Sequence, residues 1–254
     1  MNLHEHHRRM IAIAATATLG ILVPTTAPIA AQEDGCHILL SNDDGVRAPG
    51  ILALARTLAD VGVVHLIAPC DQRSGSSMAV ALRDEYALAP EGEFDLVVSG
   101  INAGANVGEA SHLSGTVGAA RAGDMRGIPA LAASAGTRID LDYAARFVAR
   151  FASEARRRGP TPGIVYSINV PRSTEAETRG VAVRPMLGMQ FTIGFAEEGD
   201  GEDGSRRFRT EVGLTKEAPP GGDTEAFTDG WITITPCDST GRPMRCSTTF
   251  GGGG

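Results

Sequence analysis

Short apolar runs that end abruptly in polar turns recur through the first two thirds of the chain. The first spans residues 36–41 and stops at Asn42-Asp43-Asp44-Gly45, and the second spans residues 63–68 and stops at Pro69. Between them, apolar side chains recur at helical spacing over residues 51–58. A buried strand, a helix and a second buried strand in this order predict a parallel, right-handed βαβ unit.

The same alternation continues along the chain. Further buried strands are expected at residues 95–99, 128–133 and 164–170, and helices at residues 117–126 and 141–158. Asp140 is a suitable N-cap for the helix at residues 141–158, and Gly159 is a suitable C-terminal end for it. These elements predict an α/β fold, a three-layer, Rossmann-like, mostly parallel sheet that forms a catalytic core over residues 32–172.

The pattern changes after Pro171. Short strand-like runs at residues 181–186, 207–214 and 231–235 alternate with acidic, glycine-rich loops, and residues 197–205 are expected to form a mobile loop. Residues 173–254 are therefore interpreted as a β-rich C-terminal extension, which either decorates the core or serves as an oligomerisation arm.

Composition narrows the class of protein and the kind of partner. Of the 254 residues, 42% are hydrophobic and 21% are charged, which is typical of a chain with a globular core. The formal net charge is −7, and no block of Lys or Arg is present, which argues against a nucleic-acid partner.

The first 31 residues have the pattern of an export signal. Basic residues at positions 8 and 9 precede an apolar stretch over residues 10–23, and small residues lead to Ala31. Gly20 and Pro24 interrupt the stretch, so a membrane-spanning helix is the less favoured alternative. We expect residues 1–31 to be a cleaved signal peptide, the mature chain to be periplasmic, and no membrane association after cleavage.

Four cysteines follow this segment, namely Cys36, Cys70, Cys237 and Cys246. None has the CxxC spacing of a zinc or redox motif. Cys237 and Cys246 flank a short turn and could close a hairpin, since export permits disulfides. Cys36 and Cys70 are expected at opposite ends of neighbouring parallel strands, which is too far apart for a bond.

Polar side chains follow three of the predicted core strands. Asp43 and Asp44 come directly after the first strand, Ser74 follows the second, and Asn102 follows the third. Because the carboxyl ends of parallel strands meet at one edge of a sheet, these side chains can converge. Carboxylate, hydroxyl and amide oxygens suit Mg²⁺ or Mn²⁺, and two carboxylates balance the charge of one such ion. The alternative for Asp43 and Asp44 is a solvated surface turn.

Ser114-Gly115-Thr116 begins the helix that follows, where backbone N–H groups and two hydroxyls form an anion site. Taken alone, the tripeptide is more simply a helix cap. Next to a cation site it suggests phosphoester hydrolysis, because a divalent ion activates water and stabilises charge on phosphoryl oxygens. His112 lies in the adjoining loop and could donate to the leaving group, although an ordinary loop histidine is the simpler interpretation. The chain has no GxSxG, HExxH or GxxxxGKS motif.

Together these segments resemble the SurE family of survival-protein nucleotidases. The resemblance runs through ILLSNDDGVRAPG (38–50), APCDQRSGSS (68–77), DLVVSGINAGANVG (95–108), SGTVGAA (114–120) and, more weakly, DTEAFTDGWITITP (223–236). It implies a metal-dependent phosphatase that hydrolyses nucleoside 5′- or 3′-monophosphates and forms homo-dimers or homo-tetramers through its C-terminal part.

The same resemblance assigns roles residue by residue. Asp43, Asp44, Ser74 and Asn102 would hold one divalent metal ion, Mg²⁺ or Mn²⁺. Asp43 or Asp44 would also orient or deprotonate the attacking water and is the expected catalytic residue. Asn106, Ser114, Gly115 and Thr116 would contact the phosphate of the nucleotide.

The chain departs from the family pattern in three places. The segment between Met78 and Phe94 is much shorter than in the family, and the chain ends in glycines at 251–254 where the family has a helix. The family is usually cytoplasmic, whereas this chain begins with an export signal. These departures leave two alternatives open: a metal- or nucleotide-binding protein with impaired catalysis, and a phosphatase for polyphosphate or other small phosphoesters.

Overall fold

The computed structural model describes residues 35–75, 77–78, 94–136, 139–159, 161, 163–171, 174–188, 191–201, 203–214 and 218–238. The predicted signal segment 1–31, most of the short linker after Met78, and Cys246 lie outside these residues. No helix within the described ranges has the length and apolar character needed to cross a membrane.

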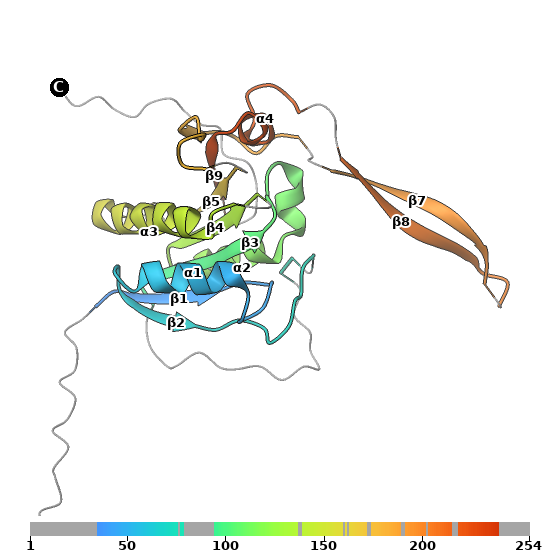
Figure 1. Cartoon of the computed structure of the whole chain (residues 1–254). Coiled ribbons are helices and arrows are strands. Elements are labelled where there is room, and N and C mark those ends of the chain that lie inside the picture. Colours follow the sequence, from blue (N-terminus) through green and yellow to red (C-terminus); the bar gives the residue numbers. More distant parts are fainter. Residues whose placement is uncertain are drawn as a thin grey trace, which may run out of the picture. The chain divides into compact units, whose positions relative to one another are not determined.

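A seven-stranded sheet forms the centre of the fold, with the strand order β2-β1-β3-β4-β5-β9-β6. The strands in this order are β2 (Val63–Leu66), β1 (His37–Ser41), β3 (Leu96–Ala103), β4 (Ala130–Ala135), β5 (Ile164–Val170), β9 (Ile232–Asp238) and β6 (Val181–Val183). The first five are parallel to one another, and β9 pairs antiparallel with β5. The predicted α/β fold with a mostly parallel sheet is therefore confirmed (Figure 1).

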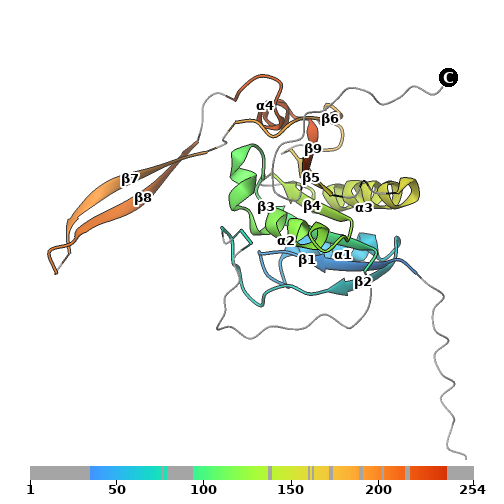
Figure 2. The same cartoon turned by 180° about the vertical axis from the view of Figure 1, so that it is seen from behind.

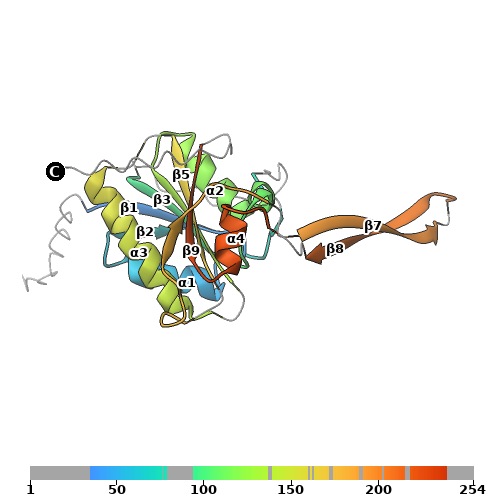
Figure 3. The same cartoon turned by 90° about the horizontal axis from the view of Figure 1, so that it is seen from above.

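Helices cover both faces of the sheet and make three layers. Helices α1 (Pro49–Leu58) and α3 (Leu141–Arg158) pack together on one face, and α2 (Gly115–Asp124) covers the other, as Figures 2 and 3 show. Asp140 caps α3 as predicted, because its carboxylate accepts hydrogen bonds from the backbone N–H groups of Asp142 (2.9 Å) and Tyr143 (3.2 Å).

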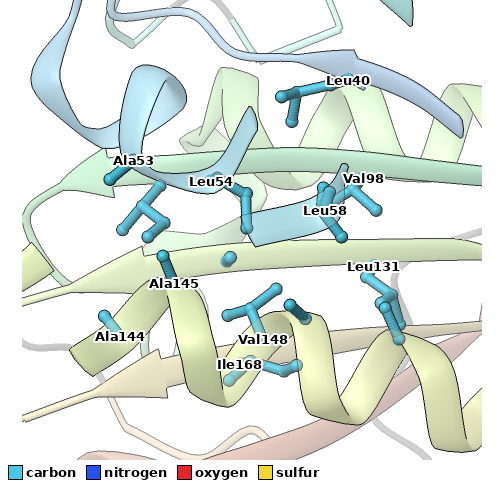
Figure 4. Packing of buried hydrophobic residues seen from close by; sticks show 14 of the residues in the cluster. Leu40, Ala53, Leu54, Leu58, Val98, Leu131, Ala144, Ala145, Val148 and Ile168 are labelled. Atoms are coloured by element: carbon cyan, nitrogen blue, oxygen red, sulfur yellow. The ribbon is translucent and has the colours of Figure 1, made fainter. Parts of the chain in front are cut away.

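The main core lies between the sheet and the α1–α3 layer. Leu40, Leu54, Val148 and Ile168 are fully buried there, and Figure 4 shows them interleaved between the two helices and the strands. Their apolar area removed from water is the main stabilising contribution of this layer. Ile38 and Leu40 of β1 and Leu96 and Val98 of β3 belong to this core. Both strands carry predicted site residues at their carboxyl ends.

Residues after 172 contribute both to the main sheet and to a separate hairpin. Strands β6 and β9 extend the main sheet, and α4 (Asp223–Thr228) packs against β9. Strands β7 (Phe191–Asp200) and β8 (Arg206–Leu214) pair only with each other. The expectation of a loop over residues 197–205 was wrong at its start, because residues 197–200 continue β7 and pair with β8 despite their acidic composition.

The described cysteines are all free thiols. Cys36 and Cys237 are buried and Cys70 is exposed. No bond joins Cys36, which precedes β1, to Cys70, which follows β2. Cys237 lies within β9 opposite Val165, and its suggested partner Cys246 lies outside the described residues. Burial raises the pKa of the Cys237 thiol to about 12.

Candidate cation and phosphate site

The turn after β1 presents two carboxylates at the carboxyl edge of the sheet. The side chain of Asn42 closes this turn, because its amide accepts from the Gly45 N–H and donates to the Gly45 carbonyl, both at 3.2 Å. Asn42 is buried. Because Asn42 makes the hydrogen bonds that close the turn, the carboxylates of Asp43 and Asp44 remain available to other partners.

Asp43 is buried against the first turn of α2. Its Oδ1 accepts a 2.5 Å hydrogen bond from Thr116 Oγ1. A Cβ added to Gly115 would lie only 2.6 Å from Asp43 Oδ2, so only glycine permits this approach. The carboxylate therefore lies at the positive end of the α2 dipole.

Asp44 connects the turn to two other strand ends. Its Oδ2 accepts from the backbone N–H of Ala103 at 2.9 Å, and its Oδ1 lies 3.4 Å from the donating Ser74 Oγ. The loop that carries Ser74 is also held by a 2.6 Å bond from the Arg73 N–H to the Asp43 carbonyl. The ends of β1 and β3 and the loop after β2 therefore meet at Asp44.

Asn102 is one of the last residues of β3 rather than part of a loop. Strand β3 continues to Ala103, beyond the predicted end at residue 99. Its Nδ2 donates to the Gly104 carbonyl at 2.7 Å, which leaves Oδ1 3.3 Å from Thr116 Oγ1. Thr116 has one hydroxyl proton, and the shorter contact shows that it goes to Asp43. Thr116 therefore donates its hydrogen bond to the Asp43 carboxylate, and its hydroxyl oxygen lies beside the Asn102 amide oxygen.

The structure thus brings the predicted cation ligands Asp43, Asp44, Ser74 and Asn102 into one cluster of oxygen atoms. No group of three or more His, Cys, Asp or Glu side chains suited to a metal occurs in the described part of the chain. A cation here must use hydroxyl and amide oxygens beside two carboxylates, which is the donor set that Mg²⁺ and Mn²⁺ accept. The residues present therefore fit such an ion.

The predicted phosphate contacts lie in two places, at the start of α2 and in the segment that follows β3. Gly115 and Thr116 lie in the first turn of α2, directly beside Asp43. Ser114 is the N-cap of α2, and its Oγ accepts from the Val117 N–H at 3.2 Å. Asn106 is buried, and its Nδ2 donates to Ser134 Oγ at 2.9 Å.

Sequence reasoning did not single out Asn169, which holds the main chain of Asn106. Its Oδ1 accepts from the Asn106 N–H at 2.7 Å, and its Nδ2 donates to the Asn106 carbonyl at 3.1 Å. Asn169 is fully buried in β5. The available signal was an amide side chain inside a largely apolar strand, which must find partners when it is buried.

Asp223 was also missed as a functional candidate. This carboxylate is fully buried at the start of α4, and burial raises its pKa above the ordinary value. Its oxygens accept from the N–H groups of Gly108, Leu187 and Thr224. The segment 223–236 showed only a weak resemblance, and the bonds of Asp223 with Gly108 and Leu187 are tertiary contacts that no local pattern reveals.

His112 lies in the short 3-10 helix η1 (Glu109–Leu113), which was not predicted. Its side chain is exposed, and its carbonyl accepts from Ser77 Oγ at 2.9 Å. This contact ties the segment before α2 to the loop after β2.

The fold and the cluster define an α/β protein with a candidate divalent-cation site at the carboxyl edge of its sheet. Comparison with known proteins gives the family. The family model described as survival protein SurE matches residues 38–92 and 84–192, and the chain belongs to this family.

Similar proteins support this membership. The 5′-nucleotidase SurE of Chlorobaculum tepidum is 35% identical over 175 residues, which cover 57% of this chain and 66% of that protein. The 5′-nucleotidase SurE of Alkalilimnicola ehrlichii is 34% identical over 229 residues, which cover 79% of this chain and 88% of that protein. The crystal structure of the SurE protein from Aquifex aeolicus matches with a TM-score of 0.69 at 25% identity, covering 80% of this chain and 93% of that one.

Proposed function

We propose that this chain is a divalent-metal-dependent phosphomonoesterase that hydrolyses nucleoside 5′- or 3′-monophosphates to nucleoside and phosphate. Relatives that bear the name 5′-nucleotidase SurE support the reaction class. The observation that carries the proposal is the contact between Thr116 and Asp43, which sets a cluster of cation-ligating oxygens against the first turn of α2.

Asp43, Asp44, Ser74 and Asn102 would hold one Mg²⁺ or Mn²⁺. When bound, the ion supplies activation of water and stabilisation of charge on the phosphoryl oxygens. The protein's own contribution is orientation. Asp44 is held by the Ala103 N–H and Asp43 by the Thr116 hydroxyl. Both carboxylates are therefore already oriented before the substrate binds.

The phosphate would bind at the first turn of α2. The first N–H groups of a helix have no partner inside the helix. In α2 the Val117 N–H is taken by Ser114 Oγ, so the N–H groups of Gly115 and Thr116 are the ones that can face a phosphate oxygen. Asp43 or Asp44, at the same place, would orient the attacking water or accept its proton.

A second candidate function is binding of a metal or nucleotide with impaired catalysis. The family match falls into two pieces, 38–92 and 84–192, which meet in the short segment between Met78 and Phe94. Residues 79–93 lie outside the described structure. Thermal stabilisation by Mn²⁺ and 5′-AMP without phosphate release would favour this candidate. Phosphate release from polyphosphate but not from 5′-AMP would favour the alternative of a phosphatase for polyphosphate or other small phosphoesters.

The direct test of the proposed site is Asp43→Asn, compared with Asp60→Asn as a matched change at an exposed position outside the cluster. Metal-dependent phosphate release should disappear in the first variant and persist in the second, with unchanged circular dichroism in both. Full activity in Asp43→Asn would refute the assignment.

We also propose that the β7–β8 hairpin mediates a homo-dimer or homo-tetramer. Phe195 pairs with Thr210 and Glu197 pairs with Phe208, so the two phenylalanines are diagonal neighbours on one face. They are 71% and 52% exposed. Exposed aromatic side chains of this size are typical of interaction surfaces.

Light scattering tests the hairpin proposal. Replacing Phe195 and Phe208 together by Ser should reduce the mass to that of a smaller assembly. Ala196→Ser, on the opposite face, should leave the mass unchanged. An unchanged assembly in the double variant contradicts the proposal.

Export to the periplasm, with cleavage after Ala31, is a further proposal that rests on the sequence pattern alone. Cell fractionation and N-terminal sequencing test it. A mature protein that begins at Gln32 in the periplasmic fraction supports it, and an uncleaved cytoplasmic chain contradicts it.

A further inference from the structure

In sequence, Gly108 lies between Asn102 and α2, and it packs against residues on both sides of the β7–β8 hairpin. A Cβ added to Gly108 would lie 2.1 Å from the Gly188 carbonyl oxygen and 2.7 Å from Thr224 Oγ1. Gly188 precedes β7, and Thr224 follows β8 in α4. The Glu109 N–H also donates to the Gly188 carbonyl at 2.6 Å. The segment between Asn102 and Thr116 is therefore packed against residues that flank the hairpin.

The Asp223 carboxylate is the polar centre of this contact. Its Oδ2 accepts from the Gly108 N–H at 3.0 Å, and its Oδ1 accepts from the N–H groups of Leu187 (3.0 Å) and Thr224 (2.9 Å). Thr235 Oγ1 donates to Oδ2 at 3.3 Å. Because both oxygens accept, an amide at this position would turn an NH₂ group toward N–H donors. Only a carboxylate satisfies all of these partners.

The segment held by Asp223 carries candidate phosphate contacts on both sides. Asn106 precedes Gly108 and is fixed by Asn169 in β5. On the other side, η1 leads to Ser114 and Thr116. The loop is thus anchored to the sheet at Asn106 and to α4, which lies beside β9 (Figure 1), at Gly108.

We infer that Asp223 is a positioning residue that sets the phosphate-binding segment through the Gly108 N–H. The inference rests on the proposed function. Asp223 makes no contact with the cation cluster among the hydrogen bonds described above, so its effect on phosphate passes through the main chain of residues 106–109. Movement of the hairpin connection at Leu187 and Gly188 would reach the site by the same route.

The test compares Asp223→Asn with Asp229→Asn in the full chain. Asp229 follows the same helix, is exposed and lies 3.9 Å from Arg179, so it provides the same chemical change without the Gly108 contact. Three quantities are measured below the unfolding temperature: amide hydrogen exchange of residues 104–113, kcat and KM for 5′-AMP with Mn²⁺, and the inhibition constant of inorganic phosphate.

In Asp223→Asn we expect exchange of residues 104–113 to accelerate, and both KM and the phosphate inhibition constant to rise on the order of tenfold, because displaced binding groups lose affinity steeply. Asp229→Asn should match the parent protein. A purely structural role would lower the active fraction and apparent kcat, with KM and phosphate inhibition unchanged. That pattern, or unaltered exchange, overturns the inference.

If Asp223→Asn does not fold, Gly108→Ala perturbs the other end of the same contact, since its Cβ meets the Gly188 carbonyl. The same changes in exchange and phosphate affinity are expected, and their absence overturns the inference. If the parent protein releases no phosphate from 5′-AMP, the proposed function fails. Hydrogen exchange and calorimetric binding of inorganic phosphate with Mn²⁺ then still test the positioning role separately.

Discussion

Thr116 Oγ1 donates a 2.5 Å hydrogen bond to Asp43 Oδ1 across 73 positions of sequence. Both side chains are buried, Thr116 completely. The bond joins the turn after β1 to the first turn of α2, so it connects a candidate cation ligand to Gly115 and Thr116, two of the candidate phosphate contacts. The orientation of the Asp43 carboxylate therefore depends on a neutral hydroxyl in a different element.

Removing this hydroxyl should impair turnover more than it impairs folding. A hydrogen bond to a charged group contributes about 1.5–3 kcal/mol. Thr116→Val is expected to reduce kcat/KM for 5′-AMP roughly ten- to a hundredfold, while Thr116→Ser, which keeps the hydroxyl, should stay within a few-fold of the parent. Steady-state kinetics with saturating Mn²⁺ measures both, and equal losses in the two variants would contradict the role of the hydroxyl.

Gly115 should tolerate no side chain. In Gly115→Ala the new Cβ would meet Asp43 Oδ2 at 2.6 Å and Asp43 Cγ at 2.8 Å. We expect a shift of the carboxylate, a loss of Mn²⁺ binding in calorimetry, and a decrease of about 1–3 kcal/mol in the free energy of unfolding.

Gly194→Ala is the matched control for that change, because a Cβ there would meet its nearest neighbour at 3.9 Å. It should bind Mn²⁺ and unfold in urea as the parent does. Parent-like Mn²⁺ affinity in Gly115→Ala would show that Asp43 is not held against α2 in the way described.

The described thiols should differ sharply in reactivity. Cys70 is exposed, whereas burial raises the pKa of Cys36 and raises that of Cys237 to about 12. The thiolate is the reactive form, so a raised pKa slows alkylation at pH 8. Peptide mapping after brief iodoacetamide treatment should find Cys70 modified, and Cys36 and Cys237 modified only in urea. Rapid native labelling of Cys237 would contradict its buried position in β9.

Strand ends were the part of the site that the sequence revealed most directly. An apolar run that stops at Asp43 and Asp44 defines a buried strand and its exit without any tertiary information. The same reasoning placed Ser74 and Asn102 at one edge, and these residues do lie together. Asn102 lies in β3 itself because the strand continues to Ala103, beyond the predicted end at residue 99.

The supporting contacts could not be predicted in this way. Asn169 lies in the largely apolar strand β5, and its partner Asn106 is 63 positions away. Asp223 receives the N–H group of its neighbour Thr224, but also those of Gly108 and Leu187, which are 115 and 36 positions away. Strand β7 was missed because its glutamates and glycines lack the alternation of a half-buried strand, and pairing with β8 decides its conformation instead.

Phosphate release from 5′-AMP by the chain from Gln32 onward tests the central claim most directly. The assay is run with Mn²⁺ and then with excess EDTA. The account predicts release that requires the metal, is lost with EDTA and returns when Mn²⁺ is restored. A folded sample that binds Mn²⁺ but releases no phosphate would contradict the phosphatase assignment and favour a binding protein.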